Sequence, residues 1–269
     1  MNKLRALVLV SRPLGWVVVP LIFARGLLAS GAELDVVSLV QAILLSFPAS
    51  LFIYGVNDIY DYNSDVRNNR KGGVEGVILE AKNRRLVENA SIFSAALLIL
   101  SALVTSSYLN MAAMAGFLLL AYFYSTPPVR LKEKPPLDSV SNGLAYYFFP
   151  FLMGTSFGNV NITARIFFIT FFVMGIHAFS TIMDFGADKK AGYKTFAVVF
   201  GKRYAALFSV IATAAVILFA GVGKITFFYM AACLAMYVII FFKPSEKLAS
   251  LFFKLILIGF LLTTINFFL

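Results

Sequence analysis

VVSLVQAILLSFPASLFIYGVNDIYDYNSD, residues 36–65, is the stretch of this chain that decides its fold. Residues 36–57 carry no charged side chain, and a run of about 20 apolar residues is long enough to cross a bilayer as a helix. Three acids then follow at Asp58, Asp61 and Asp65. Acids beside lipid are costly and mark functional sites. The stretch therefore predicts a membrane helix that ends in a functional acidic cluster.

The whole chain has the same apolar character. Of its 269 residues, 60% are hydrophobic and 13% are charged, whereas soluble domains have about 45–50% apolar and about 25% charged residues. In lipid, each apolar run must satisfy its backbone hydrogen bonds internally, as a helix does. The composition therefore predicts an all-α, multi-pass integral membrane protein of the lipid bilayer. The single cysteine, Cys233, excludes a disulfide framework and a cysteine metal site.

Apolar runs of about 17–25 residues are the signature of membrane-spanning helices, and nine such runs are expected here. They cover roughly residues 13–30, 36–57, 87–107, 109–125, 138–157, 164–184, 203–222, 225–242 and 248–268. We expect these nine transmembrane helices to form one bundle and one domain over residues 1–269. Polar loops and short helices are expected to cap the bundle on its cytoplasmic side.

Positive charge sets the expected orientation. Lys and Arg gather at the N-terminus and in the loops after the second, fourth, sixth and eighth spans, and the alternate loops hold almost none. Cytoplasmic loops carry the excess of Lys and Arg, so the N-terminus and the long polar loops are expected in the cytoplasm and the C-terminus outside. The same loops account for the net charge of +10. We therefore expect no nucleic acid as a partner.

A second acidic cluster, DFGAD at residues 184–188, ends the expected sixth span on the same side as the first. Residues four apart share one helix face, and the clusters have this spacing at Asn57, Asp61 and Asp65 and at Asp184 and Asp188. Asp58 lies about 100° away around the helix. Like charges at this spacing repel, and Mg²⁺, which binds carboxylate and phosphate oxygens, would neutralise them. The alternative is solvated helix ends paired with nearby Lys and Arg, but two clusters on one side favour a metal–diphosphate site.

Basic side chains follow both clusters. Arg67, Arg70 and Lys71 come shortly after the first cluster, and Lys194 comes after the second. Beside a metal–diphosphate complex they would neutralise the remaining charge and stabilise a departing pyrophosphate. The alternative is that these residues only set the membrane topology.

The paired clusters resemble the motifs of the UbiA superfamily of intramembrane prenyltransferases. Members resemble nine-helix bundles with NDxxDxxxD after helix two and DxxxD after helix six, which read NDIYDYNSD and DFGAD here. The resemblance implies transfer of a prenyl group from an allylic prenyl diphosphate to a lipophilic acceptor through an allylic carbocation, with release of pyrophosphate. It also implies a magnesium cofactor of two or more ions. Its implied metal-binding and catalytic residues are Asp61, Asp65, Asp184 and Asp188, assisted by Asn57.

The sequence departs from the family pattern at one place. Many members carry Tyr-x-x-x-Lys at the end of helix four, whereas Tyr124 is followed four residues later by Pro128. Arg130 or Lys132 is expected to take over the basic role. The expected diphosphate-binding residues are therefore Arg67, Arg70, Lys71, Arg130, Lys132 and Lys194.

The acceptor is harder to assign from the residues. The stretches around both motifs are similar to lycopene elongase-like members, which implies a carotenoid acceptor. Aromatic or quinone prenyltransferases and geranylgeranylglyceryl-phosphate prenyltransferases of the same superfamily are the alternatives. A cation-coupled membrane transporter is the rival from another class, but its ion sites would lie near the bilayer midplane. For His177, a hydrogen-bonded structural role is favoured over that of the final proton acceptor.

Overall fold

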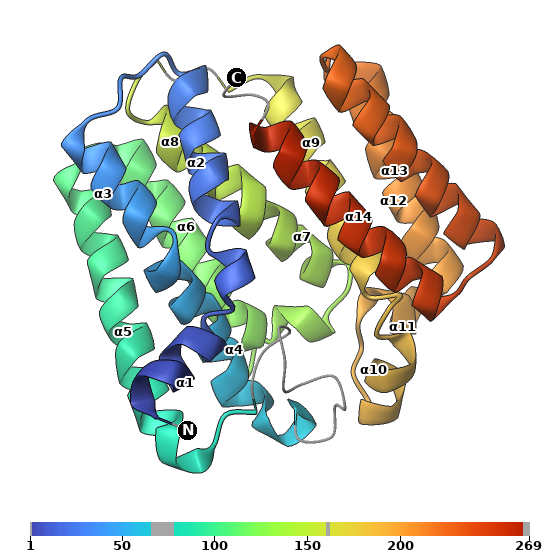
Figure 1. Ribbon diagram of the computed structural model, residues 1–269, viewed down its shortest axis with the longest axis horizontal. Coiled ribbons are helices and arrows are strands. Elements are labelled where there is room, and N and C mark those ends of the chain that lie inside the picture. The colour runs from blue at the N-terminus through green and yellow to red at the C-terminus, as the bar shows by residue number, and fades with distance from the viewer. Residues whose placement is uncertain (1, 66–77, 160–161, 266–269) are drawn as a thin grey trace. The chain divides into compact units, whose positions relative to one another are not determined.

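A computed structural model of the chain, shown in Figure 1, describes residues 2–159 and 162–265 except for residues 66–77, and describes residues 63–65 by their backbone alone. The regular structure of these described residues is helical, which confirms the all-α prediction. The chain packs as two compact units. Unit 1 consists of Met1–Arg130 and Phe149–Asn161, and unit 2 consists of Leu131–Phe148 and Ile162–Leu269. The expectation of one domain over residues 1–269 stays a prediction.

Unit 1 contains the first acidic motif. Its helices are α1 (Lys3–Val10), the 3₁₀ turn η1 (Pro13–Gly15), α2 (Val18–Ala29), α3 (Val36–Leu44), α4 (Phe47–Asp65), α5 (Ala81–Val104), α6 (Tyr108–Ser125) and α8 (Phe149–Thr155). Gly26 of α2 and Gly154 of α8 let these helices touch, because a Cβ at either glycine would collide with the backbone of the other helix. Such close approach through small residues is typical of membrane helices, which gain little from burying apolar surface against one another.

A buried polar network joins other helices of unit 1. Gln41 of α3 and Asn110 of α6 are fully buried, and their side-chain amides exchange two hydrogen bonds of 2.9 Å. The Asn110 amide also donates to the Met153 carbonyl and to Ser156 Oγ. Polar groups buried among apolar helices must be satisfied in this way, so the network fixes the register of the helices it joins.

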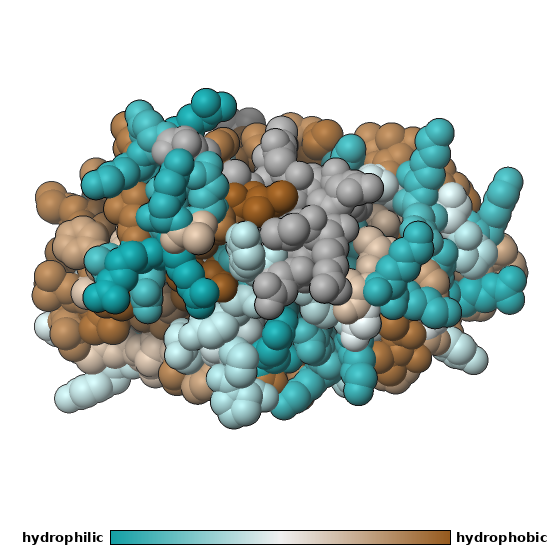
Figure 2. All heavy atoms as spheres, turned by 90° about the horizontal axis from the view of Figure 1, so that it is seen from below, coloured by the Kyte–Doolittle hydropathy of each residue, from teal (hydrophilic) through white to brown (hydrophobic). Residues whose placement is uncertain are grey.

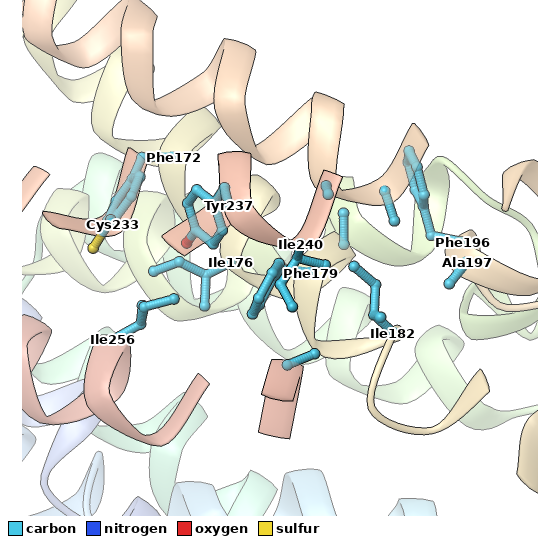
Figure 3. Close-up of a cluster of buried hydrophobic side chains, with 14 of the residues drawn as sticks. Phe172, Ile176, Phe179, Ile182, Phe196, Ala197, Cys233, Tyr237, Ile240 and Ile256 are labelled. Carbon is cyan, nitrogen blue, oxygen red and sulfur yellow. The ribbon is translucent and has the colours of Figure 1, made fainter. Parts of the chain in front are cut away.

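Unit 2 contains the second acidic motif. Its elements are the 3₁₀ turn η2 (Leu131–Glu133), α7 (Leu137–Gly143), the π-helical turn η3 (Leu144–Phe148), α9 (Ala164–Ser180), α10 (Phe185–Ala191), α11 (Phe196–Phe200), α12 (Lys202–Phe219), α13 (Lys224–Phe242) and α14 (Glu246–Ile265). A buried cluster drawn from α9, α11, α12, α13 and α14 forms its core (Figure 3). Phe179 packs on Tyr237 with ring centroids 4.7 Å apart. The core therefore ties the short helix α11 to the long helices.

The predicted count of nine spans is not confirmed. Among the described residues, six helical stretches are long and apolar enough to cross a membrane, or up to eight if each of two bent helix pairs is one span. The expected span at 138–157 is divided into α7, η3 and α8. Pro150, near the start of α8, has no N–H and crowds the carbonyl four residues back. A regular α-helix therefore cannot run through this segment, and a π-helical turn precedes the proline instead.

The outer surface fits a membrane environment. Many large hydrophobic side chains are exposed, among them Phe93, Leu218 and Phe228. Figure 2 shows broad hydrophobic areas together with hydrophilic side chains that gather on the face in view. In a soluble protein such apolar exposure would promote association, whereas in a bilayer the same side chains contact lipid.

Candidate active site

Asp58 of the first motif forms an ion pair with Arg12. Its side chain is fully buried, and Arg12 Nη2 donates to Asp58 Oδ1 at 3.1 Å. The Arg12 guanidinium also lies 4.2 Å from the centroid of the Tyr54 ring. Arg12 precedes η1, so this contact ties the N-terminal segment to α4. The structure thus pairs Asp58 with a cation of the N-terminal segment.

Asp61 lies beside Arg130, one of the two basic residues that the sequence suggested. Only 8% of Asp61 is exposed, and Arg130 Nη2 lies 3.4 Å from Asp61 Oδ1. The Arg130 backbone N–H donates to the Thr126 carbonyl at 2.9 Å, which holds the turn after α6. Asn57 Nδ2 donates to Ser125 Oγ at 2.9 Å, also at the end of α6. The end of α6 therefore supplies partners to two residues of the motif.

The remainder of the first motif lies largely outside the described residues. Asp65 is the last residue of α4, and its side chain is not described. The predicted diphosphate ligands Arg67, Arg70 and Lys71 also fall outside the described residues.

The second motif lies where a long helix breaks. The chain turns by 71° between α9 and α10. Asp184 stands at the N-cap of α10, and Asp188 lies in its first turn. Asp188 Oδ2 accepts a 3.0 Å hydrogen bond from Thr195 Oγ1. Both half-buried acids therefore lie at the start of a helix, where backbone N–H groups and the helix dipole favour negative charge.

Basic residues accompany the second motif as well. Lys132 Nζ lies 6.0 Å from the centroid of the Tyr193 ring, and the Tyr193 N–H donates to the Asp188 carbonyl at 2.9 Å. The structure thus places Lys132 beside the loop that follows α10. Lys194, the other predicted diphosphate ligand in this loop, is exposed.

Three contacts around α10 were not foreseen. Lys202 Nζ donates to Glu246 Oε1 at 2.7 Å and lies 4.4 Å from the Phe185 ring centroid. A Cβ at Gly186 would lie 3.1 Å from the Glu246 carboxylate. The starts of α12 and α14 therefore hold α10 in place. Only tertiary contact reveals this arrangement, since the residues are far apart in sequence.

Asp138 was also missed, although the sequence carried a signal for it. It is an acid inside an apolar segment, and 1% of it is exposed. Its Oδ1 accepts from the Ser139 N–H at 2.6 Å and its Oδ2 from the Phe196 N–H at 2.9 Å. The neighbouring Ser139 Oγ lies 3.1 Å from His177 Nδ1. His177 is thus hydrogen-bonded, in line with the structural interpretation.

The donor chemistry of both motifs fits magnesium, which prefers carboxylate and amide oxygens. Asp61 belongs to unit 1, and Asp184 and Asp188 belong to unit 2. Within the part of the chain that the structure describes, no three His, Cys, Asp or Glu side chains form a group that could hold a metal ion. That part does not include the Asp65 side chain. Each motif thus combines carboxylate oxygens with a nearby cation, Arg130 or Lys132.

Comparisons with known proteins agree on a family. The model of the UbiA prenyltransferase family matches residues 17–261. A lycopene elongase/hydratase from Corynebacterium glutamicum is 29% identical over 215 residues, which are 78% of this chain and 75% of that protein. A lycopene elongase/hydratase from Haloferax volcanii is 34% identical over 212 residues, which are 75% of this chain and 67% of that protein. A solved UbiA homolog from Archaeoglobus fulgidus, bound to DMAPP and Mg²⁺, has a similar fold, with a TM-score of 0.68 and 23% identity over 97% of this chain and 99% of that one.

Proposed function

This chain belongs to the UbiA prenyltransferase family, and from that membership we propose that it transfers a prenyl group from an allylic prenyl diphosphate to a carotenoid acceptor. As a member of this family, the chain is an integral membrane prenyltransferase. The carotenoid acceptor is supported by the lycopene elongase/hydratase relatives. The allylic diphosphate is supported by the DMAPP and Mg²⁺ in the Archaeoglobus fulgidus homolog.

One observation carries the proposal, namely that each acidic motif comes with a basic partner. Arg130 contacts Asp61, and Lys132 lies at the loop next to Asp188. A site built only to bind cations would gain from acids alone, because nearby cations compete with the metal. A site for a metal–diphosphate complex needs both signs of charge.

The residues divide the work of the proposed reaction. Asn57, Asp61, Asp65, Asp184 and Asp188 would hold magnesium, two ions or more. Bound magnesium would supply positive charge to the diphosphate oxygens. Arg130 and Lys132, joined by Arg67, Arg70, Lys71 and Lys194, would bind the diphosphate and stabilise the charge that grows on it as the C–O bond breaks.

The proposed bond changes balance with water as the only further reactant, because water also takes up the released proton. The allylic C–O bond breaks and its electron pair leaves with pyrophosphate. An electron pair from a terminal C=C bond of the acceptor then forms the new C–C bond to the allylic carbon. The resulting cation loses a proton or takes up water, and water uptake would match the hydratase part of the relatives' names.

In the membrane, we propose that the N-terminus and the motif loops face the cytoplasm and the C-terminus faces outside.

Product analysis with purified protein in liposomes tests this function. Dimethylallyl or geranyl diphosphate would be supplied with Mg²⁺ and either lycopene, an aromatic acceptor or geranylgeranylglyceryl phosphate. We expect a longer carotenoid and one pyrophosphate for each new C–C bond, with both absent in EDTA and in Asp61→Ala. Asp35→Asn is the matched control, since Asp35 only caps α3 and Asn is as good an N-cap. Turnover with another acceptor alone would reject the carotenoid, and folded protein without allylic diphosphate cleavage would reject the reaction.

A further inference from the structure

The capping of α11 shows an unusual exchange of roles. The first N–H groups of a helix have no partner within the helix, and the N-cap side chain commonly accepts from one of them. Thr195 is the N-cap of α11, yet its side chain makes no capping hydrogen bond. The Phe196 N–H donates instead to Asp138 Oδ2 at 2.9 Å, and the Ala197 N–H to Thr181 Oγ1 at 3.0 Å. Asp138 and Thr181, both distant in sequence, thus cap α11 in place of the Thr195 side chain.

The Thr195 hydroxyl, which does not cap α11, contacts the second acidic motif instead. Thr195 Oγ1 donates to Asp188 Oδ2 at 3.0 Å. A hydroxyl has one proton to donate, and here that proton goes to a carboxylate of the second motif. The path from Asp138 to Asp188 is therefore short, running through the Phe196 N–H and the neighbouring Thr195.

The rest of unit 2 holds this arrangement rigidly. Phe196 is 5% exposed and Ala197 is fully buried, and both belong to the buried cluster of unit 2 (Figure 3). Asp138 is itself 1% exposed. A buried carboxylate is costly unless its oxygens accept hydrogen bonds, and the N–H groups of Ser139 and Phe196 satisfy both oxygens. The acid is therefore placed with both of its acceptors in use.

We propose that Asp138 is a positioning residue for Asp188: by capping α11 it keeps the Thr195 hydroxyl on the Asp188 carboxylate and so orients that carboxylate toward Mg²⁺. Without Asp138, the Thr195 hydroxyl turns back to accept from the N–H groups of its own helix, as an ordinary N-cap does. Asp188 then loses the hydrogen bond from Thr195, one helical turn from the like charge of Asp184. The link to magnesium rests on the proposed function, but the link from Asp138 to Asp188 does not.

Partners of this kind have a recognised effect on metal sites. Removing a group that orients a metal ligand lowers metal affinity by about 10–100-fold. For the variants below we expect a loss of metal affinity near the lower end of this range, because the Asp188 carboxylate itself remains. Asp138→Asn is the suitable variant, because it keeps the volume but presents an NH₂ group to one of the two N–H donors. Thr195→Val removes only the last link, and Thr195→Ser retains it.

Two measurements on the full-length protein in detergent test the proposal. The first is amide hydrogen exchange without metal, which should accelerate at Phe196 and Ala197 in Asp138→Asn and should not change there in Ser209→Ala. The second is Mn²⁺ binding with inorganic pyrophosphate as the probe, followed by the electron paramagnetic resonance of free Mn²⁺. Ser209→Ala is the matched control, because Ser209 is a buried polar residue of unit 2 whose hydroxyl donates to backbone carbonyls of α9 and α12.

The expected result is a Mn²⁺ dissociation constant raised about 10-fold in Asp138→Asn and in Thr195→Val, with near-normal binding in Thr195→Ser. The double variant should be no worse than either single one, since both break the same path. Wild-type affinity in folded Asp138→Asn would overturn the proposal, as would an equal loss in Ser209→Ala. If Asp138→Asn does not fold, wild-type affinity in Thr195→Val overturns it. Wild-type protein that binds Mn²⁺ and pyrophosphate but transfers no prenyl group would reject the function and leave the positioning role intact.

Discussion

Arg12 and Arg130 share an uncommon backbone conformation. Their φ angles are 50° and 40°, in the left-handed region that side chains other than glycine rarely adopt. Such a conformation costs on the order of 1–3 kcal/mol and persists where surrounding contacts impose it. Each arginine also contacts an acid of the first motif, Asp58 or Asp61. At both positions the strained backbone therefore places a guanidinium beside an acid of the first motif.

Substituting Arg130 should weaken diphosphate binding more than it affects folding. A hydrogen bond to a charged group contributes about 1.5–3 kcal/mol, so Arg130→Gln should raise the KM for the allylic diphosphate by about 10-fold or more. Arg130→Lys should retain part of the effect, because lysine keeps the charge but loses the planar fork. Steady-state kinetics at saturating Mg²⁺ would measure this. An exposed arginine, changed as Arg203→Gln, serves as control, and an unchanged KM in Arg130→Gln would refute the assignment.

The Arg12–Asp58 pair should act on stability and not on magnesium. Breaking a buried ion pair leaves an uncompensated charge at a cost of about 3–5 kcal/mol, and a smaller cost of about 2 kcal/mol is expected because Arg12 is partly exposed. Arg12→Ala should therefore lower the unfolding temperature clearly. Asp58→Asn removes the charge itself and should cost less. The Mg²⁺ concentration for half-maximal activity should stay within about twofold of wild type in Asp58→Asn, and a large increase would make Asp58 a metal ligand.

At the scale of secondary-structure elements, helices α2 and α8 pack closely against each other at glycine residues. A Cβ at Gly154 would meet the backbone of Phe23 and Leu27, whereas the three atoms nearest to a Cβ at Gly116 of α6 belong to the Phe149 ring. A side chain can rotate away, but the backbone of a packed helix must shift as a whole. Overpacking in such places costs about 1–3 kcal/mol.

The same substitution should therefore have different effects at the two glycines. Gly154→Ala should lower thermal stability in detergent by at least about 2 kcal/mol. Gly116→Ala should cost less, because ring rotation and the better helix propensity of alanine, about 1 kcal/mol, offset the contact. Thermal unfolding followed by circular dichroism gives the comparison. Equal stability of the two variants would show that the α2–α8 crossing tolerates separation.

The sequence predicted elements well where one physical cue dominates. The apolar runs located the stretches that became the long helices α4, α5, α6, α12, α13 and α14, since a bilayer leaves few options to such a run. The sequence did not predict the helix breaks at Pro150 and after Ser180, because an apolar run looks the same whether or not the helix bends within it. The departure from the family's Tyr-x-x-x-Lys pattern pointed to Arg130 or Lys132 as a basic residue of the site, but not to the contact of Arg130 with Asp61. The contacts of Asp138 with Phe196 and of Lys202 with Glu246 depend on packing between distant segments, which no local pattern contains.

At the scale of the whole molecule, the two units each carry one acidic motif. Unit 1 contributes Asp61 with Arg130, and unit 2 contributes Asp184 and Asp188 with Lys132. We propose that both motifs serve one reaction. A protein in which only one motif held the metal would need only the acids of one unit.

Pyrophosphate release from dimethylallyl diphosphate by Asp61→Asn and Asp188→Asn, compared with wild type and with Asp35→Asn, tests this claim most directly. Removing one of the residues that act as a unit in catalysis costs nearly as much as removing several. We expect kcat/KM to fall at least about 1,000-fold, or about 4 kcal/mol, in each single variant, and little further in the double variant. Asp35→Asn should match wild type. Near-wild-type turnover in either single variant, with the protein folded and Mg²⁺ saturating, would contradict the claim that both motifs are needed.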